Sequence, residues 1–178
     1  MRLSYKLSTL FRIPAAAEAE AEGDWVNLVK VLSATQDSEE MDRLAAALGR
    51  VASKEAVPPL MKLVLDGFEK AKRIESQVRE ASLDPMAALA ERLRTQTGVF
   101  TVGYRPDQVE SPISRLKLEA ERHFHRKNAA LDAIVRIGSE DALQAVIDDP
   151  STFDELRRSL KSNMEFFISQ RAVRHGSV

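Results

Sequence analysis

The sequence predicts an all-α fold, a short and irregular α-solenoid of antiparallel helical hairpins, and three observations support this prediction. Apolar residues recur at helical spacing along most of the chain. Hydrophobic residues make up 44% and charged residues 30%, which is typical of a globular domain with its own core. Two segments, ALGRVASKEAV at 47–57 and AIVRIGSEDAL at 133–143, share one pattern. Each places a serine and an acid where a second helix would begin, so we interpret both as helix–turn–helix corners.

The composition limits the classes of function that the chain can have. It carries 26 Lys and Arg against 27 Asp and Glu, so it lacks the excess of positive charge typical of nucleic-acid-binding proteins. The absence of cysteine excludes disulfides, thiolate metal sites and a cysteine nucleophile, and it suits a reducing compartment. No run of about 18 apolar residues is present, so we expect no membrane-spanning helix and a cytoplasmic protein.

Residues 1–14 form a basic, amphipathic N-terminal segment without an acid. On a helix its leucines share one face, and we expect this segment to contact a partner. Three interpretations stay open: a helix docked on the first hairpin or on a partner, a segment on a membrane surface, or a targeting signal. The side chains expected to contact the partner are Leu3, Tyr5, Leu7 and Phe11.

The helical domain is expected at 15–170, and its first elements have clear boundary signals. Residues 15–22 are Ala and Glu, which favour helix. Gly23 and Asp24 then supply a break and an N-cap for a helix at 25–33, where apolar residues recur at helical spacing.

Two longer helices are expected next, each after a polar turn that can supply its N-cap. The first covers about 38–52 and the second about 56–82. Pro58 and Pro59 fall in the first turn of the second helix, where the missing N–H groups cost little. Asp84 begins a further helix by the same capping logic.

The helical pattern stops at 95–111, which we predict to be an irregular loop with an extended or hairpin-like stretch at 99–104. Loops of this length inside a compact domain are often functional. Aromatic and Arg side chains are enriched at interface hot spots, so Phe100, Tyr104 and Arg105 are predicted to contact a partner. The alternative, in which the two rings fill the gap between the flanking hairpins, stays open.

Helices resume after the loop. A long helix is expected at 112–137, and a short one follows the second corner at 140–148. Ser151 or Thr152 is expected to cap a last helix, and residues 171–178 are expected to form a polar tail. The apolar face of the last helix is predicted to consist of Phe153, Leu156, Leu160, Met164 and Phe167.

The segment 41–65 resembles the PBS-lyase subtype of HEAT repeat, because LAAALGRV followed by EAVPPL is close to that family's pattern over both helices of one repeat. Residues 128–143 resemble a second, weaker copy, and residues 25–32 resemble the outgoing helix of a degenerate repeat. HEAT repeats recur about every 40–47 residues, so the 86 residues from Arg50 to Arg136 correspond to two repeat lengths. The resemblance implies a HEAT-like solenoid whose stacked hairpins form a binding surface.

Two histidines are the first candidates for a chemical site. His123 and His125 cannot hold one ion together, because residues two apart on a helix do not face each other. Glu119 with His123, and Glu121 with His125, are spaced to supply only half of a metal site each. We therefore expect no metal ion, no cofactor and no catalytic residue.

A group of cations is the second candidate. Residues 112–136 hold six cations against three acids, and the last helix adds three more cations. Gathered in one groove they would bind phosphate or an acidic partner, but the interleaved acids favour a mixed, solvated surface. The cations are Arg115, Lys117, Arg122, Arg126, Lys127, Arg136, Arg157, Arg158 and Lys161.

The sequence therefore predicts a non-catalytic protein-binding adaptor, assembly factor or structural subunit of a larger complex. The expected partners are proteins, and a membrane surface is a further candidate through the N-terminal segment. Nucleic acid and a small-molecule substrate are not expected. Two alternatives stay open: a bilin-lyase-like subunit, since some relatives of the resembled family help attach bilin chromophores to antenna proteins, and a peripheral membrane or nucleic-acid-binding HEAT-like protein.

Overall fold

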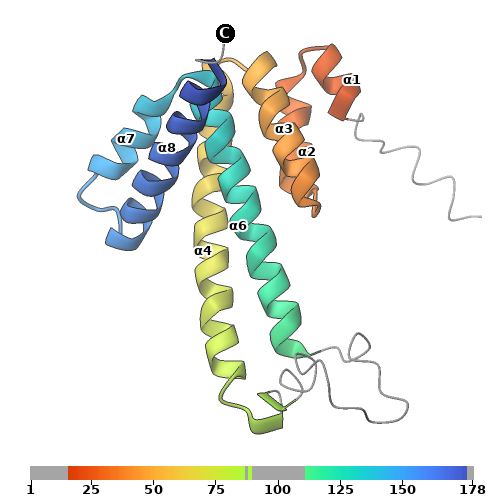
Figure 1. Cartoon of the computed structure of the whole chain (residues 1–178), viewed down its shortest axis with the longest axis vertical. Coiled ribbons are helices and arrows are strands. Elements are labelled where there is room, and N and C mark those ends of the chain that lie inside the picture. The colour runs from red at the N-terminus through yellow and green to blue at the C-terminus, as the bar shows by residue number, and fades with distance from the viewer. Residues whose placement is uncertain (1–15, 87, 90–110, 176–178) are drawn as a thin grey trace, which may run out of the picture. The chain divides into compact units, whose positions relative to one another are not determined.

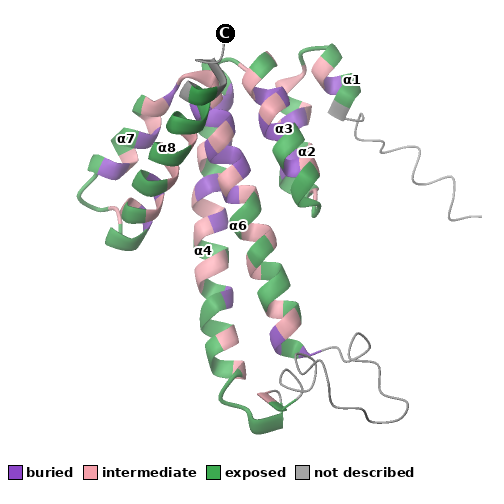
Figure 2. Cartoon of the chain, viewed as in Figure 1, coloured by how far each residue is buried: buried purple, intermediate pink, exposed green. Residues whose placement is uncertain are grey.

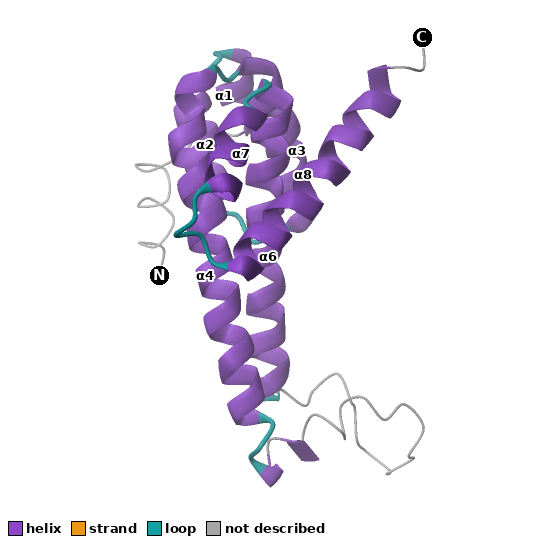
Figure 3. Ribbon diagram, turned by 90° about the vertical axis from the view of Figure 1, so that its left-hand side faces the viewer, coloured by secondary structure: helices purple, strands orange, loops and turns teal. Residues whose placement is uncertain are grey.

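Every regular element in the described part of the chain is a helix. The computed structural model describes residues 16–86, 88–89 and 111–175, and no strand occurs among them (Figure 3). The predicted all-α, solenoid-like fold class is confirmed. The predicted extended stretch at 99–104 lies outside the described residues. None of the helices in the described ranges combines the length and the apolar character needed to cross a bilayer.

The described residues divide into two compact units. Figure 1 labels the helices that make them up. The first unit contains the described residues up to Leu65 together with those from His125 onward. The second unit contains the described residues from Asp66 to Phe124. The predicted limits of the helical domain, 15–170, stay a prediction.

The first two helices meet at the predicted break. These helices are α1 (Ala16–Ala21) and α2 (Trp25–Ala34). Between them Gly23 has a φ of 69°, a left-handed conformation that glycine adopts without steric cost. The side chain of Asp24 accepts a hydrogen bond of 3.1 Å from the backbone N–H of Asn27, which confirms the predicted N-cap.

The first corner motif lies between α3 (Ser38–Val51) and a short 3₁₀ turn, η1 (Lys54–Ala56). Asp37 caps α3 by accepting hydrogen bonds of 2.8 and 3.1 Å from two backbone N–H groups of its first turn. Ser53 caps η1 with one hydrogen bond of 3.3 Å from the backbone N–H of Glu55. These caps satisfy donors that the helix backbone leaves without partners.

Two long helices contribute to both units. They are α4 (Val57–Ala81) and α6 (Pro112–Ile137), and both agree closely with the predicted ranges. Pro58 and Pro59 lie in the first turn of α4, as predicted. Helical backbone also follows Asp84, which accepts a hydrogen bond of 2.9 Å from the backbone N–H of Met86.

The core of the first unit consists of aliphatic side chains on one face of each helix (Figure 2). Burying one such side chain stabilises the fold by about 1.5–3 kcal/mol, so packing rather than helix propensity holds these helices together. Fully buried members include Leu28, Leu32, Leu44, Leu48, Leu60, Leu131, Ile134, Leu143 and Leu160.

The second unit has a smaller core. Its described parts of α4 and α6 lie side by side in Figures 1 and 3. Ile74 and Ile113 are buried, with 5% and 3% of their surface exposed. The Ser111 hydroxyl is also buried and accepts a hydrogen bond of 3.2 Å from the backbone N–H of Ile113, so this serine caps the beginning of α6.

The last two helices are α7 (Glu140–Asp148) and α8 (Asp154–His175). Two details of the prediction for α8 are wrong. The Thr152 hydroxyl donates a hydrogen bond of 2.7 Å to the carbonyl of Val146 instead of capping α8. Phe153 is 75% exposed, because it precedes the helix rather than lying on its buried face. The helix also continues through His175, into the segment 171–178 that was expected to be a tail.

Candidate functional site

The two corner motifs meet each other in the first unit. Gly49 of the first motif lies against Arg136 of the second, and a Cβ added to this glycine would overlap the Cβ and Cδ atoms of that arginine. The two segments are 86 residues apart in the sequence, and their helices, α3 and α6, approach closely because this position has no side chain.

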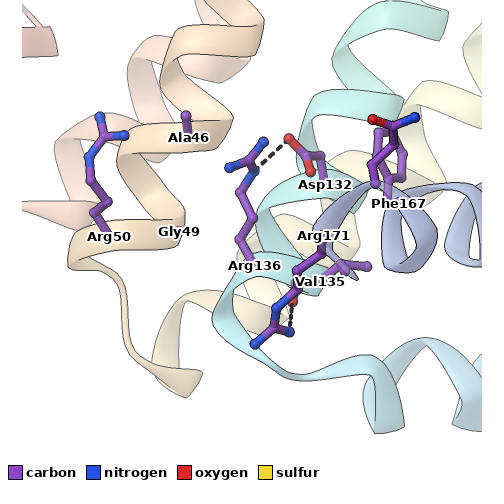
Figure 4. Close-up of a pocket in the computed structure, with 9 residues that line it drawn as sticks. Ala46, Gly49, Arg50, Asp132, Val135, Arg136, Phe167 and Arg171 are labelled. Atoms are coloured by element: carbon purple, nitrogen blue, oxygen red, sulfur yellow. Dashed lines mark hydrogen bonds and ion pairs between the residues drawn. The ribbon is translucent and has the colours of Figure 1, made fainter. Parts of the chain in front are cut away.

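A pocket opens beside this contact, and we call it the corner pocket. Its volume is about 350 Å³. Three helices supply its walls, and Figure 4 shows Arg136 between α3 and Asp132. The lining residues are Ala46, Gly49 and Arg50 of α3, Asp132, Val135 and Arg136 of α6, and Phe167, Gln170 and Arg171 of α8.

Each arginine of the corner pocket forms a hydrogen-bonded ion pair with an acidic side chain. The Arg136 Nε atom donates to Asp132 Oδ2 at 2.7 Å, one helical turn away, and these side chains are 26% and 18% exposed. The Arg50 Nε atom donates to Glu20 Oε1 of α1 at 2.6 Å. The hydrogen bond raises the pKa of Arg50 and lowers the pKa of Glu20, so both groups stay charged near neutral pH.

Arg171 fixes α8 to the second corner. Its Nη1 atom donates to the carbonyl oxygen of Val135 at 2.9 Å (Figure 4). The same atom donates to Glu140 Oε1 at 3.0 Å. A cation at the carbonyl end of α6 is favoured by the helix dipole. The same bonds orient the rest of this side chain along the wall of the pocket.

Two of the other predicted cations donate hydrogen bonds to backbone carbonyls at helix ends. Arg126 donates to the carbonyls of Leu32 and Thr35 at the end of α2, at 3.2 and 2.6 Å, and its burial lowers the pKa of this guanidinium. Arg157 donates to the carbonyls of Ile147 and Asp149 at the end of α7, at 2.9 and 3.1 Å. For Arg126 and Arg157 the expectation of a solvated surface is wrong. Their N–H groups donate to backbone carbonyls that have no hydrogen-bond partner within their own helix.

Lys127 departs furthest from the expected solvated surface. It is only 2% exposed, and its Nζ atom donates to Ser159 Oγ of α8 at 3.0 Å. Desolvation by burial lowers the pKa of this ammonium group. The sequence does not reveal this burial, because the flanking residues are also polar and Ser159, which accepts the hydrogen bond, belongs to a helix 32 residues further along the chain.

The histidines do not form a metal site with the described acids. His123 Nε2 lies 3.9 Å from Glu119 Oε1 in the second unit. Within the described residues, no group of three or more histidine and acidic side chains is placed to hold a metal ion. A groove of about 340 Å³ beside this pair is lined by α4 and α6 residues that include Lys70 and Arg73.

The predicted partner-contacting residues lie outside the described residues. They are Leu3, Tyr5, Leu7, Phe11, Phe100, Tyr104 and Arg105. Their roles therefore stay predictions.

The fold and the paired corners define a helical repeat protein. Comparison with protein families agrees: residues 42–66 match the family described as PBS lyase HEAT-like repeat. The match covers α3 from Asp42 onward, η1 and the beginning of α4, and it confirms the HEAT-like repeat predicted at 41–65. No curated protein and no solved structure matches the chain.

Proposed function

We propose that the chain is a non-catalytic, protein-binding adaptor, assembly factor or structural subunit of a larger complex, located in the cytoplasm. The observation that carries the proposal is the surface of α8 beside the corner pocket. After Leu160 none of the described side chains of α8 is buried. Phe166 and Val173, seven residues apart and therefore on one face of α8, are 55% and 65% exposed. The Phe166 ring meets the Phe167 ring edge to face, with centroids 5.3 Å apart.

Exposed apolar side chains of this size gain free energy when a partner removes them from water. These side chains are already exposed in the first unit, so a partner could reach them without unfolding it. HEAT-like repeats commonly present such surfaces, since each hairpin packs on its neighbours and leaves the remaining face available. The N-terminal segment and the loop 95–111 would supply further contacts.

The test is affinity capture with crosslinking from the native host. Full-length protein, Phe166→Ser and the double variant Phe100→Ala/Tyr104→Ala are compared for the partners that they retain. We expect Phe166→Ser to lose a partner that the unaltered protein captures, because the variant removes buried apolar area at the interface.

Phe153→Ser is the matched control. Phe153 is 75% exposed in the same unit but precedes α8, so its removal deletes a phenylalanine outside the proposed surface. Equal loss of partners with both variants, or no partner retained by the unaltered protein, would contradict the proposal. Liposome flotation of the full chain against a chain beginning at Ala15 separates membrane contact from protein contact.

A further inference from the structure

We propose that the second half of α8 is a strap that opens and closes over the corner pocket while the rest of the first unit stays folded. The strap consists of residues 161–175. This inference goes beyond the proposed function, because it concerns a motion of the free protein and not the identity of a partner.

The first half of α8 is anchored in the core of the first unit. Leu156 and Leu160 are 7% and 0% exposed. Arg157 donates to carbonyls at the end of α7, and Ser159 accepts a hydrogen bond from the buried Lys127 of α6. Moving this half would expose apolar area and break a hydrogen bond of a buried ammonium group, so we expect it to stay in place.

The strap lacks anchors of this kind. None of its described side chains is buried, so opening it exposes little further apolar area. Beyond Asn163, Arg171 is the one described residue of α8 whose side chain bonds to another helix. The side chains of Arg171 and Glu140 are 43% and 33% exposed, and an ion pair in contact with water contributes little stability. One side chain near the end of α8 is therefore the main tether of the strap.

The space between the strap and its neighbours also indicates weak packing. Phe167, Gln170 and Arg171 form one wall of the corner pocket, whose volume is about 350 Å³. Figure 4 shows Phe167 and Arg171 on α8, beside Val135 of α6. Side chains that line a space lose the dispersion contacts that a packed interface supplies. The strap can therefore leave α6 at a smaller cost than the first half of α8, and its departure would uncover Val135, which is 1% exposed.

The test uses thiol labelling, because the chain contains no cysteine. Val135→Cys places a single thiol on the α6 wall of the pocket, where a labelling reagent reaches it only when the strap is open. Val64→Cys is the matched control, since Val64 is also buried in the first unit but does not line the pocket. Without urea, we expect the Val135→Cys protein to be labelled at least about tenfold faster than the Val64→Cys protein.

The dependence on urea separates local from global opening. Low urea should leave the labelling of Val135→Cys unchanged and speed that of Val64→Cys, because only global unfolding exposes a large surface. Hydrogen exchange of the unaltered protein is the second measurement. Backbone amides of the strap should exchange at rates insensitive to low urea, whereas those of the anchored first half should follow global unfolding.

A further variant identifies the tether. Adding Arg171→Gln to Val135→Cys should speed labelling about tenfold, because it removes the hydrogen bonds to Val135 and Glu140. High salt should speed it about twofold by screening the ion pair. Arg158→Gln is the control, since Arg158 is an exposed arginine of α8 that bonds to a carbonyl of its own helix.

Three results would overturn the inference. Equal and urea-dependent labelling of the two cysteine variants would mean that only global unfolding uncovers the pocket. Labelling of Val135→Cys that Arg171→Gln leaves unchanged, or that Arg158→Gln speeds equally, would mean that Arg171 is not the tether. Strap amides that exchange as slowly as those of the first half of α8 would mean that the strap does not open by itself.

Discussion

Gly49 permits a close approach between the two corner motifs. Gly49→Ala places a Cβ where the Arg136 side chain already lies, so α3 and α6 must move apart. We expect a loss of about 1–3 kcal/mol in the free energy of unfolding, although alanine is the better helix former. Urea denaturation measures the change. Arg43→Ala, at an exposed position of the same helix, should change stability by less than about 0.5 kcal/mol.

The serines of the two corners occupy the same motif position but have different roles. Ser53 caps η1, whereas the buried Ser139 Oγ has no hydrogen-bond partner among the described residues. We expect Ser53→Ala to cost about 0.5–1 kcal/mol and Ser139→Ala to be neutral or stabilising, as measured by urea denaturation. A larger loss for Ser139→Ala than for Ser53→Ala would contradict this assignment.

Lys127 makes stability depend on pH in the alkaline range. Its pKa lies below the ordinary value of 10.5 when the protein is folded, so between these two values the unfolded chain binds more protons. The free energy of unfolding should therefore rise with pH through this interval for the unaltered protein relative to Lys127→Met. Denaturation at several pH values measures the difference. Lys161→Met, at an exposed position of α8, controls for the change in net charge.

At the scale of elements, the two halves of α8 differ in burial. The first half contributes side chains to the core, whereas no described side chain after Leu160 is buried. Leu160 is fully buried, whereas Phe166 is 55% exposed. We expect Leu160→Ala to lower the free energy of unfolding by about 2–4 kcal/mol and Phe166→Ala by less than about 1 kcal/mol. Similar losses in urea denaturation would mean that the second half of α8 is also packed, and the proposed partner surface would be lost.

Element boundaries were well predicted where the signals are local. The helix expected at 38–52 is Ser38–Val51, and the one expected at 112–137 is Pro112–Ile137. Capping side chains, proline and apolar spacing act within one or two turns, so a single sequence contains them. The beginning of α8 was missed because Thr152 bonds to a carbonyl of α7, a contact between elements that local capping rules do not include.

At the scale of the whole chain, the match between the corners was visible in the sequence, but their contact was not. HEAT-like hairpins are expected to pack on their neighbours in sequence order. Here the corners meet within the first unit, while the residues between Asp66 and Phe124 form a second unit. The corner pocket follows from that contact, since α3, α6 and α8 each supply one wall.

The sequence by itself determined the helical fold, the HEAT-like repeat and most helix boundaries, because helical periodicity and capping depend on neighbours within a few residues. The tertiary structure alone decided which cations are buried, which serine caps its helix and which arginines line the corner pocket. Those outcomes depend on side chains brought together from distant segments, as Gly49 is with Arg136, and burial changes both their hydrogen bonding and their charge.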